Sequence, residues 1–188
     1  MKKISKKIIV ILSLFGLLSC ITIYVWLPTK DTQPCTFCNP QIIQTHTFYE
    51  DDLVRGLCTH KPILPYHCLI VIKRHIAKIE DATENEMSAA FRLIKRINAI
   101  VQKINGPSSY MLLQKNGAEV GQTVPHVHIH YIPKKESDHK SLATFGLLWH
   151  FVLSPFQRPI SKKELAERVE KMKDSCNTTF FIKNHRPC

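Results

Sequence analysis

Apolar and β-branched residues gather in short runs along the middle of the chain. These runs occupy residues 47–57, 67–72, 109–114 and 126–132, and they predict β-strands. The proline-containing stretch THKPILP between the first two predicts a loop. The glycine-bearing stretch KNGAEVGQT joins the last two, which we expect to be neighbours in a sheet.

An amphipathic helix is predicted between the two pairs of strands. Thr83 and Glu86 form a T-x-x-E capping box at its start, and Gly106-Pro107 ends it. Apolar residues recur every three or four positions between these limits, so we expect a core-facing stripe of Met87, Phe91, Ile94, Ile97, Val101 and Ile104. The element order is strand, strand, helix, strand, strand.

The pattern loosens after about residue 134, and residues 136–188 form a C-terminal extension. A helix is predicted in it near residues 161–174, because Ser161 and Glu164 make a second capping box. One face of this helix is apolar and carries Leu165, Val169 and Met172.

The N-terminal region differs from the rest. Residues 1–7 are a basic tail, and the uncharged run 8–27 has the roughly 20 residues that a transmembrane helix needs. The positive-inside rule then predicts a membrane anchor with the following domain extracytoplasmic, after a polar linker at 28–34. A cleaved signal peptide of a secreted protein, or a lipoprotein with LLSC as lipobox, are the alternatives; apolar residues continuing past Cys20 favour the anchor.

Length and charge limit the possible functions. A chain of 188 residues suits one domain with appendages. The net charge of +11 favours anionic partners, but no basic stripe is interleaved with aromatic residues, so a dedicated nucleic-acid partner is not predicted. Small phosphorylated molecules would benefit from the same positive field.

Three of the ten histidines fall within five positions of the last predicted strand. His126, His128 and His130 alternate with apolar residues, so their side chains share one strand face. Successive residues on one face lie roughly 6.5 Å apart. The three imidazoles can therefore surround one anionic group, or divide between a metal and a substrate.

The seven cysteines do not decide the redox compartment. Cys35 and Cys38 alone have a meaningful spacing. Their C-x-x-C pattern is a common zinc half-site that needs two further ligands from elsewhere.

The sequence NGAEVGQTVPHVHIHYIP, with CTFC, FYEDDLV and HCLIVIKRH upstream in the same order, resembles the histidine-triad (HIT) family of nucleotidyl hydrolases and transferases, in particular its bacterial members. The resemblance covers residues 35–135, which we take as the HIT domain. It implies an α+β fold with an antiparallel sheet of about five strands and packed helices, preceded here by the predicted anchor helix. It also implies a homodimer.

The resemblance further implies a mechanism and a set of site residues. His128 would attack the α-phosphorus of a nucleotide-like substrate and form a nucleotidyl-histidine, which water then hydrolyses. Imidazole suits this role because much of it is neutral and nucleophilic near pH 7. His130, His126 and His67 would assist, and the phosphate would contact Gly121, Gln122 and Thr123.

Zinc is the second implication of the resemblance. His75 and His126 would complete a structural Cys2His2 site with Cys35 and Cys38, which would tie the N-terminal segment to the catalytic strand. In an oxidising compartment, the alternative is a disulfide between the two cysteines.

Three positions depart from the family pattern. Thr59 replaces an aspartate that holds the ribose, Lys115 replaces an amide side chain, and Tyr66 replaces a small glycine. Two other hypotheses therefore accompany the hydrolase: a non-catalytic phosphate-ligand or metal-binding module, and a metallohydrolase whose three triad histidines hold a catalytic ion.

Overall fold

The computed structural model describes residues 34–135 and 158–180. They belong to the second of two compact units, Thr32–Cys188. The predicted membrane segment, 8–27, lies outside the described residues and stays a prediction. Within the described ranges, no helix is long and apolar enough to cross a membrane.

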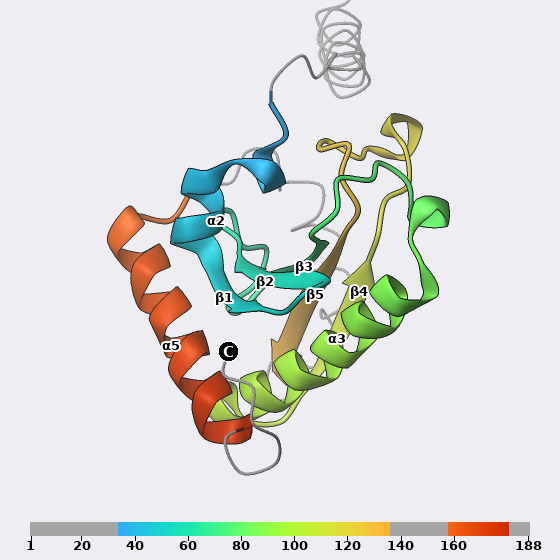
Figure 1. Cartoon of the computed structure of the whole chain (residues 1–188). Coiled ribbons are helices and arrows are strands. Elements are labelled where there is room, and N and C mark those ends of the chain that lie inside the picture. The colour runs from blue at the N-terminus through green and yellow to red at the C-terminus, as the bar shows by residue number, and fades with distance from the viewer. Residues whose placement is uncertain (1–33, 136–157, 181–188) are drawn as a thin grey trace, which may run out of the picture. The chain divides into compact units, whose positions relative to one another are not determined.

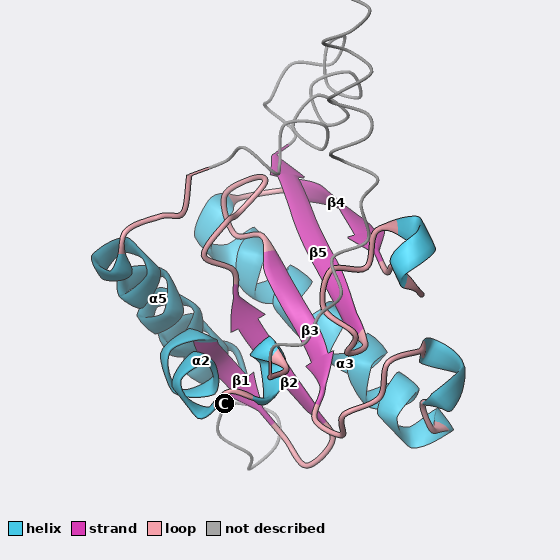
Figure 2. Cartoon of the chain, turned by 90° about the horizontal axis from the view of Figure 1, so that it is seen from above, coloured by secondary structure: helices cyan, strands magenta, loops and turns pink. Residues whose placement is uncertain are grey.

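An antiparallel sheet of five strands forms the centre of the described domain. Its spatial order is β1-β2-β3-β5-β4, so the histidine strand lies inside the sheet. Figure 2 shows the five strands side by side. The bounds are β1 (Thr47–Glu50), β2 (Val54–Cys58), β3 (Cys68–Ile72), β4 (Ser108–Leu113) and β5 (His128–Lys135). The α+β fold with about five antiparallel strands is therefore confirmed.

Three α-helices accompany the sheet in the described residues: α2 (Pro40–His46), α3 (Glu84–Asn105) and α5 (Lys162–Phe180) (Figure 1). The capping box of α3 is formed in full. The Thr83 hydroxyl accepts a hydrogen bond from Glu86 N at 3.2 Å, and the Glu86 carboxylate accepts one from Thr83 N at 2.8 Å. The helix predicted between residues 83 and 105 is confirmed.

Helices α3 and α5 cover one face of the sheet, where their buried side chains form the main core with those of the strands. In Figure 2, α3 runs behind the strands. The other face has a small cluster formed by Phe37, Leu57, Leu69 and Val71. Leu69 and Val71 pair with His130 and His128, and directly paired residues of antiparallel strands share a face. The histidines therefore lie on the face opposite the two helices.

Helix α5 confirms the predicted helix of the C-terminal extension and joins the core. Leu165, Val169 and Met172 are buried as predicted, and Cys176 is buried with them. At its start the Ser161 hydroxyl accepts a hydrogen bond from Glu164 N at 3.1 Å.

The run at residues 47–57 is not one strand, and this prediction was wrong. The Asp51 carboxylate accepts hydrogen bonds from Leu53 N and Val54 N, both at 2.9 Å, and this turn divides the run into the β1–β2 hairpin. The strand predicted from residue 126 begins two residues later, at His128. Helix α2 and the 3-10 turn η1 (Thr36–Cys38) were not predicted.

Phe91 is the one wrong member of the predicted helix stripe, because 53% of it is exposed. At about 100° per residue, it lies roughly 60° beyond Ile94, on the side away from Ile97. The buried arc extends the other way and includes Ala89, Ala90, Leu93 and Ile100.

Candidate active site and metal centre

Four side chains from three separate segments converge beside the start of β5. Cys35 precedes η1, Cys38 ends it, His75 follows β3, and His126 precedes β5. Their donor atoms all lie within 4.8 Å of one another. The His126 Nδ1 atom is 3.3 Å from Cys35 Sγ and 3.6 Å from Cys38 Sγ, and His75 Nδ1 is 3.5 Å from Cys38 Sγ. The ligand atoms of tetrahedral zinc lie about 3.3–3.8 Å apart, and these three distances fall in that range.

The protonation of His126 also suits a metal. Its Nε2 lies 2.6 Å from the Ile72 carbonyl oxygen. A carbonyl only accepts, so the proton is on Nε2 and the Nδ1 lone pair faces the two sulfurs. A ring nitrogen held by a backbone carbonyl is the usual support of a metal-binding histidine.

His128 has the opposite arrangement. Its Nδ1–H donates to the His126 carbonyl oxygen at 2.7 Å, which fixes the proton on Nδ1 and leaves a lone pair on Nε2. The ring of Phe37 packs against both histidines, with its centroid 5.8 Å from that of His126 and 4.9 Å from that of His128. Phe37 therefore contacts both His126, a member of the Cys2His2 group, and His128.

His67 and His130 form a directed pair. Ile63 N–H donates to His67 Nδ1 at 3.1 Å, so the proton of His67 is on Nε2. That Nε2–H donates to His130 Nδ1 at 2.9 Å, which in turn leaves the proton of neutral His130 on Nε2. The His128 and His130 ring centroids lie 5.0 Å apart. His128 thus presents a lone pair on Nε2, and the neighbouring ring of His130 presents an N–H donor on its own Nε2.

Burial keeps these imidazoles neutral. It lowers the pKa of His67 to about 4. Burial, with the nearby His128, His67 and Lys115, lowers the pKa of His130 to about 3. The pKa of His128 is also lowered, chiefly by burial. All three rings are therefore uncharged at neutral pH, the state in which a histidine can act as a nucleophile.

The loop expected to bind phosphate is held by its own hydrogen bonds. Gly121 has a φ of 78°, which glycine adopts without strain. The Gln122 side chain accepts from Gly117 N at 2.6 Å and donates to Val124 O at 3.1 Å. Gly121 N and Gln122 N donate to loop carbonyls as well. Among the described residues, Thr123 takes no part in these bonds, so its hydroxyl and N–H are the donors left for a ligand.

The HIT domain family model matches residues 41–137, just over half of the chain. The chain belongs to the HIT domain family. The resemblance drawn from the histidine motif is thereby confirmed, together with the C-x-x-C at Cys35 and Cys38.

Two curated relatives are nucleotide hydrolases by name. The asymmetrical bis(5'-nucleosyl)-tetraphosphatase of Schizosaccharomyces pombe is 32% identical over 51% of this chain and 53% of its own length. The bis(5'-adenosyl)-triphosphatase of Dictyostelium discoideum is 36% identical over 55% of this chain and 70% of its own length. The chain thus spans about half the length of the first of these relatives.

Among solved structures, a Zn-bound histidine triad family protein from Mycobacterium smegmatis has the same fold. Its TM-score is 0.54 at 17% identity, over 86% of this chain and 96% of that protein.

Lys115 is a site residue whose position the sequence did not reveal. Its Nζ donates to Gly121 O at 3.1 Å, and its charge contributes to the lowered pKa values of His128 and His130. In this HIT domain, a cation therefore lies beside the loop that is expected to bind phosphate.

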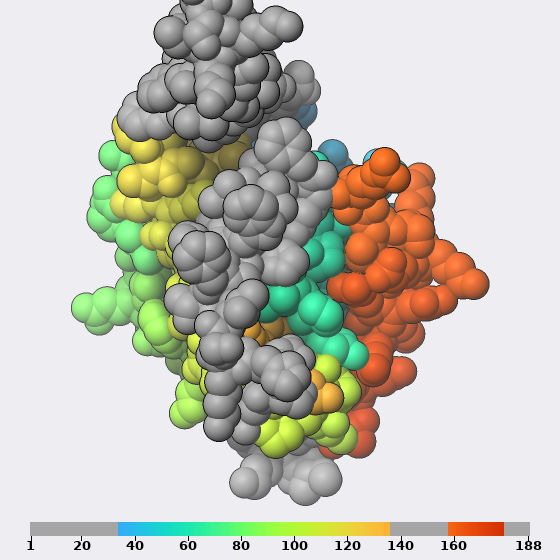
Figure 3. Space-filling model, turned by 180° about the vertical axis from the view of Figure 1, so that it is seen from behind, coloured from blue at the N-terminus to red at the C-terminus, as the bar shows by residue number. Residues whose placement is uncertain are grey.

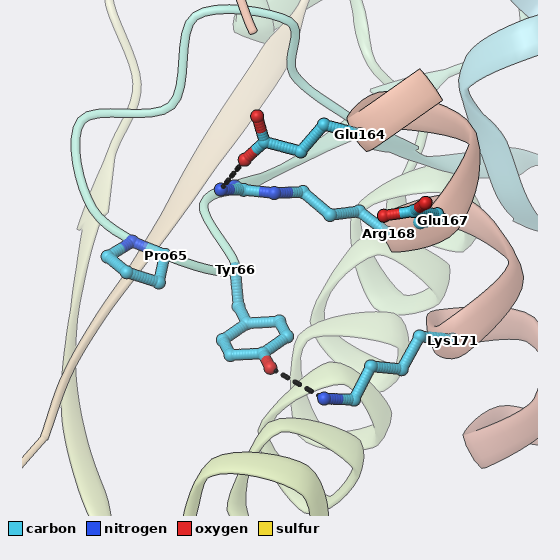
Figure 4. A pocket seen from close by; sticks show the side chains of 6 residues that line it. All are labelled: Pro65, Tyr66, Glu164, Glu167, Arg168 and Lys171. Atoms are coloured by element: carbon cyan, nitrogen blue, oxygen red, sulfur yellow. Dashed lines mark hydrogen bonds and ion pairs between the residues drawn. The ribbon is translucent and has the colours of Figure 1, made fainter. Parts of the chain in front are cut away.

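A cavity of about 280 Å³ lies behind the His67 turn, between the β2–β3 segment and α5. The surfaces of these two segments adjoin in Figure 3, in teal and orange. Figure 4 shows the cavity lined by Pro65, Tyr66, Glu164, Glu167, Arg168 and Lys171. The side chain of Tyr66 points toward α5, and its hydroxyl accepts a hydrogen bond from Lys171 Nζ at 3.0 Å.

The structure brings the sequence-predicted site residues together in two groups. His67, His128 and His130 form one, and His126 joins the cysteines and His75 in the other. The three motif histidines thus divide between a Cys2His2 group that could hold a metal ion and the neighbouring pair of His128 and His130.

Proposed function

We propose that the chain is a HIT nucleotide hydrolase that works through a nucleotidyl-histidine on His128. The observation that carries this proposal is the 2.7 Å hydrogen bond from His128 Nδ1 to the His126 carbonyl. It leaves a lone pair on Nε2 of a ring that is fixed and neutral. The two relatives named for hydrolysing dinucleoside polyphosphates support a nucleotide-like substrate.

In the first step, Nε2 of His128 attacks the α-phosphorus. A P–N bond forms, and the bond from phosphorus to the leaving group breaks with its electron pair on the leaving group. The ring becomes cationic while its Nδ1–H stays on the His126 carbonyl, which stabilises that charge. A phosphate leaving group departs as an anion, whereas an amine leaving group takes a proton from solvent. Water then attacks phosphorus and loses a proton to solvent, the P–N bond breaks with its electron pair on Nε2, and neutral His128 is restored.

The neighbouring groups supply charge stabilisation, which phosphoryl transfer chiefly requires. His67 orients His130 so that its Nε2–H can donate to a phosphoryl oxygen. The hydroxyl and N–H of Thr123 are further donors, and Lys115 provides positive charge next to the Gly121 loop.

Cys35, Cys38, His75 and His126 are the proposed ligands of a structural zinc ion. Two sulfurs and two nitrogens make a closed set without an open coordination position, so the ion would hold the fold and take no part in the chemistry. Each sulfur lies within 3.6 Å of a histidine Nδ1 atom, and this mixed donor set supports zinc over a Cys35–Cys38 disulfide.

The metallohydrolase alternative finds less support. In the described part of the chain, the triad histidines form no common donor cluster, since His126 alone belongs to the metal group. Nδ1 of His128 and of His130 are both engaged by other protein atoms.

The homodimer stays a proposal, for which β4 offers a surface. It is an edge strand, and Tyr110 and Leu112 are 42% and 37% exposed on it. Light scattering on the purified chain distinguishes a monomer of 21.7 kDa from a dimer. The extracytoplasmic, membrane-anchored location is likewise a proposal, and a reporter fused after residue 34 tests it.

The mechanism is tested with the full chain in detergent and an adenosine phosphoramidate. Intact mass spectrometry should show a transient nucleotidyl adduct that peptide mapping places on His128. His128→Ala should lose both adduct and turnover, while His60→Ala, which removes an exposed histidine, should keep both. Turnover that persists in His128→Ala refutes the mechanism. Substrate binding without adduct or turnover in the folded native chain would support a non-catalytic module.

A further inference from the structure

Two cysteines that play no part in the proposed zinc site lie opposite one another in the sheet. Cys58 ends β2, Cys68 begins β3, and their Cα atoms are register partners. Both are free thiols, 5% and 1% exposed. Because partners in antiparallel strands project to the same face, the two sulfurs meet within the core beneath α5.

The register of β2 and β3 shows whether Cys58 and Cys68 form a hydrogen-bonded or a non-hydrogen-bonded pair. Lys73 N donates to Leu53 O at 2.8 Å, and these residues continue the register that pairs Val54 with Ile72. Hydrogen-bonded and non-hydrogen-bonded pairs alternate along an antiparallel ladder. Five positions further along, Cys58 and Cys68 occupy a non-hydrogen-bonded pair.

That position brings two cysteines within bonding reach. Cα atoms of non-hydrogen-bonded pairs are about 4.5 Å apart, with their side chains closer than in the other pairs. Disulfides span Cα separations of about 4.4–6.8 Å. The two thiols already interact, since a hydrogen bond from the Cys58 side chain, with burial, raises the pKa of Cys68.

We propose that Cys58 and Cys68 form an intramolecular disulfide that closes the loop carrying His67. The oxidant is a small or protein disulfide, such as oxidised glutathione. One thiolate attacks it to give a mixed disulfide and one thiol, and the second thiolate then displaces the other thiol. A Sγ–Sγ bond forms, the oxidant's S–S bond breaks, and the two thiol protons pass to its two sulfurs.

Buried thiols in the native state react poorly. We therefore expect the disulfide to form during folding, or when local opening of the hairpin exposes the two thiols. Cys176 is disulfide-bonded, so the chain is already suited to a compartment that oxidises thiols.

The cross-link would act on the turn before the reactive histidines, a consequence that rests on the proposed function. The loop that it closes includes Tyr66 and His67. In the thiol form, Cys68 S–H donates to the Tyr66 carbonyl at 3.1 Å. A disulfide sulfur has no proton to donate, so oxidation removes this bond and replaces it with a covalent restraint one residue from His67.

The experiment uses the full chain with zinc, refolded from urea in oxidised glutathione or in dithiothreitol, followed by alkylation and trypsin. Both cysteines fall in the tryptic peptide 56–73, because Pro62 protects the bond after Lys61. In the oxidised sample we expect this peptide to lack alkyl groups and to weigh two hydrogen atoms less. It should accept two alkyl groups after reduction.

Stability provides a second measurement that needs no substrate. Closing a loop of about eleven residues should raise Tm by roughly 5–10 °C over the reduced chain. Other disulfides contribute to that difference, so it is compared with the same difference in Cys58→Ala and in Cys68→Ala. Both variants should show a smaller one. Full alkylation of peptide 56–73 after oxidative refolding, or equal Tm differences in native chain and variants, would overturn the proposal whether or not the hydrolase proposal holds.

Discussion

Tyr66 should be replaceable by glycine at less cost than by alanine, the reverse of the usual order. Its φ is 63°, in the left-handed region, which costs a residue with a Cβ roughly 1–2 kcal/mol. Alanine would keep this strain and glycine would lose it. The greater freedom of glycine in the unfolded chain costs about 0.5–1 kcal/mol. Glycine should therefore be the more stable variant by about 1 kcal/mol.

The comparison isolates the backbone because both variants lose the same side-chain contacts. These are the hydrogen bond that Lys171 Nζ donates to the Tyr66 hydroxyl at 3.0 Å and the packing of the ring against the core. Urea unfolding with a common m-value would measure the difference, which corresponds to about 2–4 °C in Tm. Tyr110 in β4 is the control, since among the described residues Tyr66 alone has a positive φ without being glycine. At Tyr110, alanine should be the more stable variant. Equal or greater stability of Tyr66→Ala over Tyr66→Gly would refute the strain argument.

Further predictions concern metal and pH. Replacing Cys35 and Cys38 together by serine should reduce bound zinc, measured by plasma mass spectrometry, to background and lower Tm; a full complement of zinc in the variant would contradict the site. His67 and His130 have pKa values lowered to about 4 and about 3. Below pH 6.5 the unfolded chain therefore takes up protons that the folded chain does not. The free energy of unfolding should fall as the pH drops toward 4, by roughly 3 kcal/mol for His67 alone. In urea unfolding, His67→Gln should show a weaker dependence on pH. Arg74 holds the pKa of Glu86 at about 2, so the stability that this carboxylate contributes is present above pH 4.5 and lost toward pH 2. Glu86→Gln keeps an acceptor for the cap but loses the charge-assisted hydrogen bonds from Arg74, which should cost about 1 kcal/mol at pH 7; an unchanged urea midpoint would contradict that role.

The sequence predicted those features that depend on local chemistry. The Thr83–Glu86 box, the periodic stripe after it and the H-x-H-x-H alternation each express a rule that acts over a few residues. The split of the 47–57 run was missed because one side chain, Asp51, makes the turn in a segment that is otherwise apolar enough for a strand.

The sequence could not predict which ring nitrogen of each histidine carries the proton. It depends on which carbonyl or N–H the ring meets: Ile72 O for His126, His126 O for His128, and Ile63 N for His67. Two of these partners come from segments more than 50 residues away or from a folded turn. The motif predicts three imidazoles on one face, and only tertiary contacts assign the protons.

Helix α5 follows the segment that the family model recognises, yet Leu165, Val169, Met172 and Cys176 complete the apolar layer on one side of the sheet. The stretch that the family model matches and the stretch that builds the core are therefore of different lengths. A fragment ending at residue 137 would expose the core positions that α5 covers, together with the partner of Tyr66. The histidine motif thus depends for part of its supporting core on a helix that lies outside the segment that the family model matches.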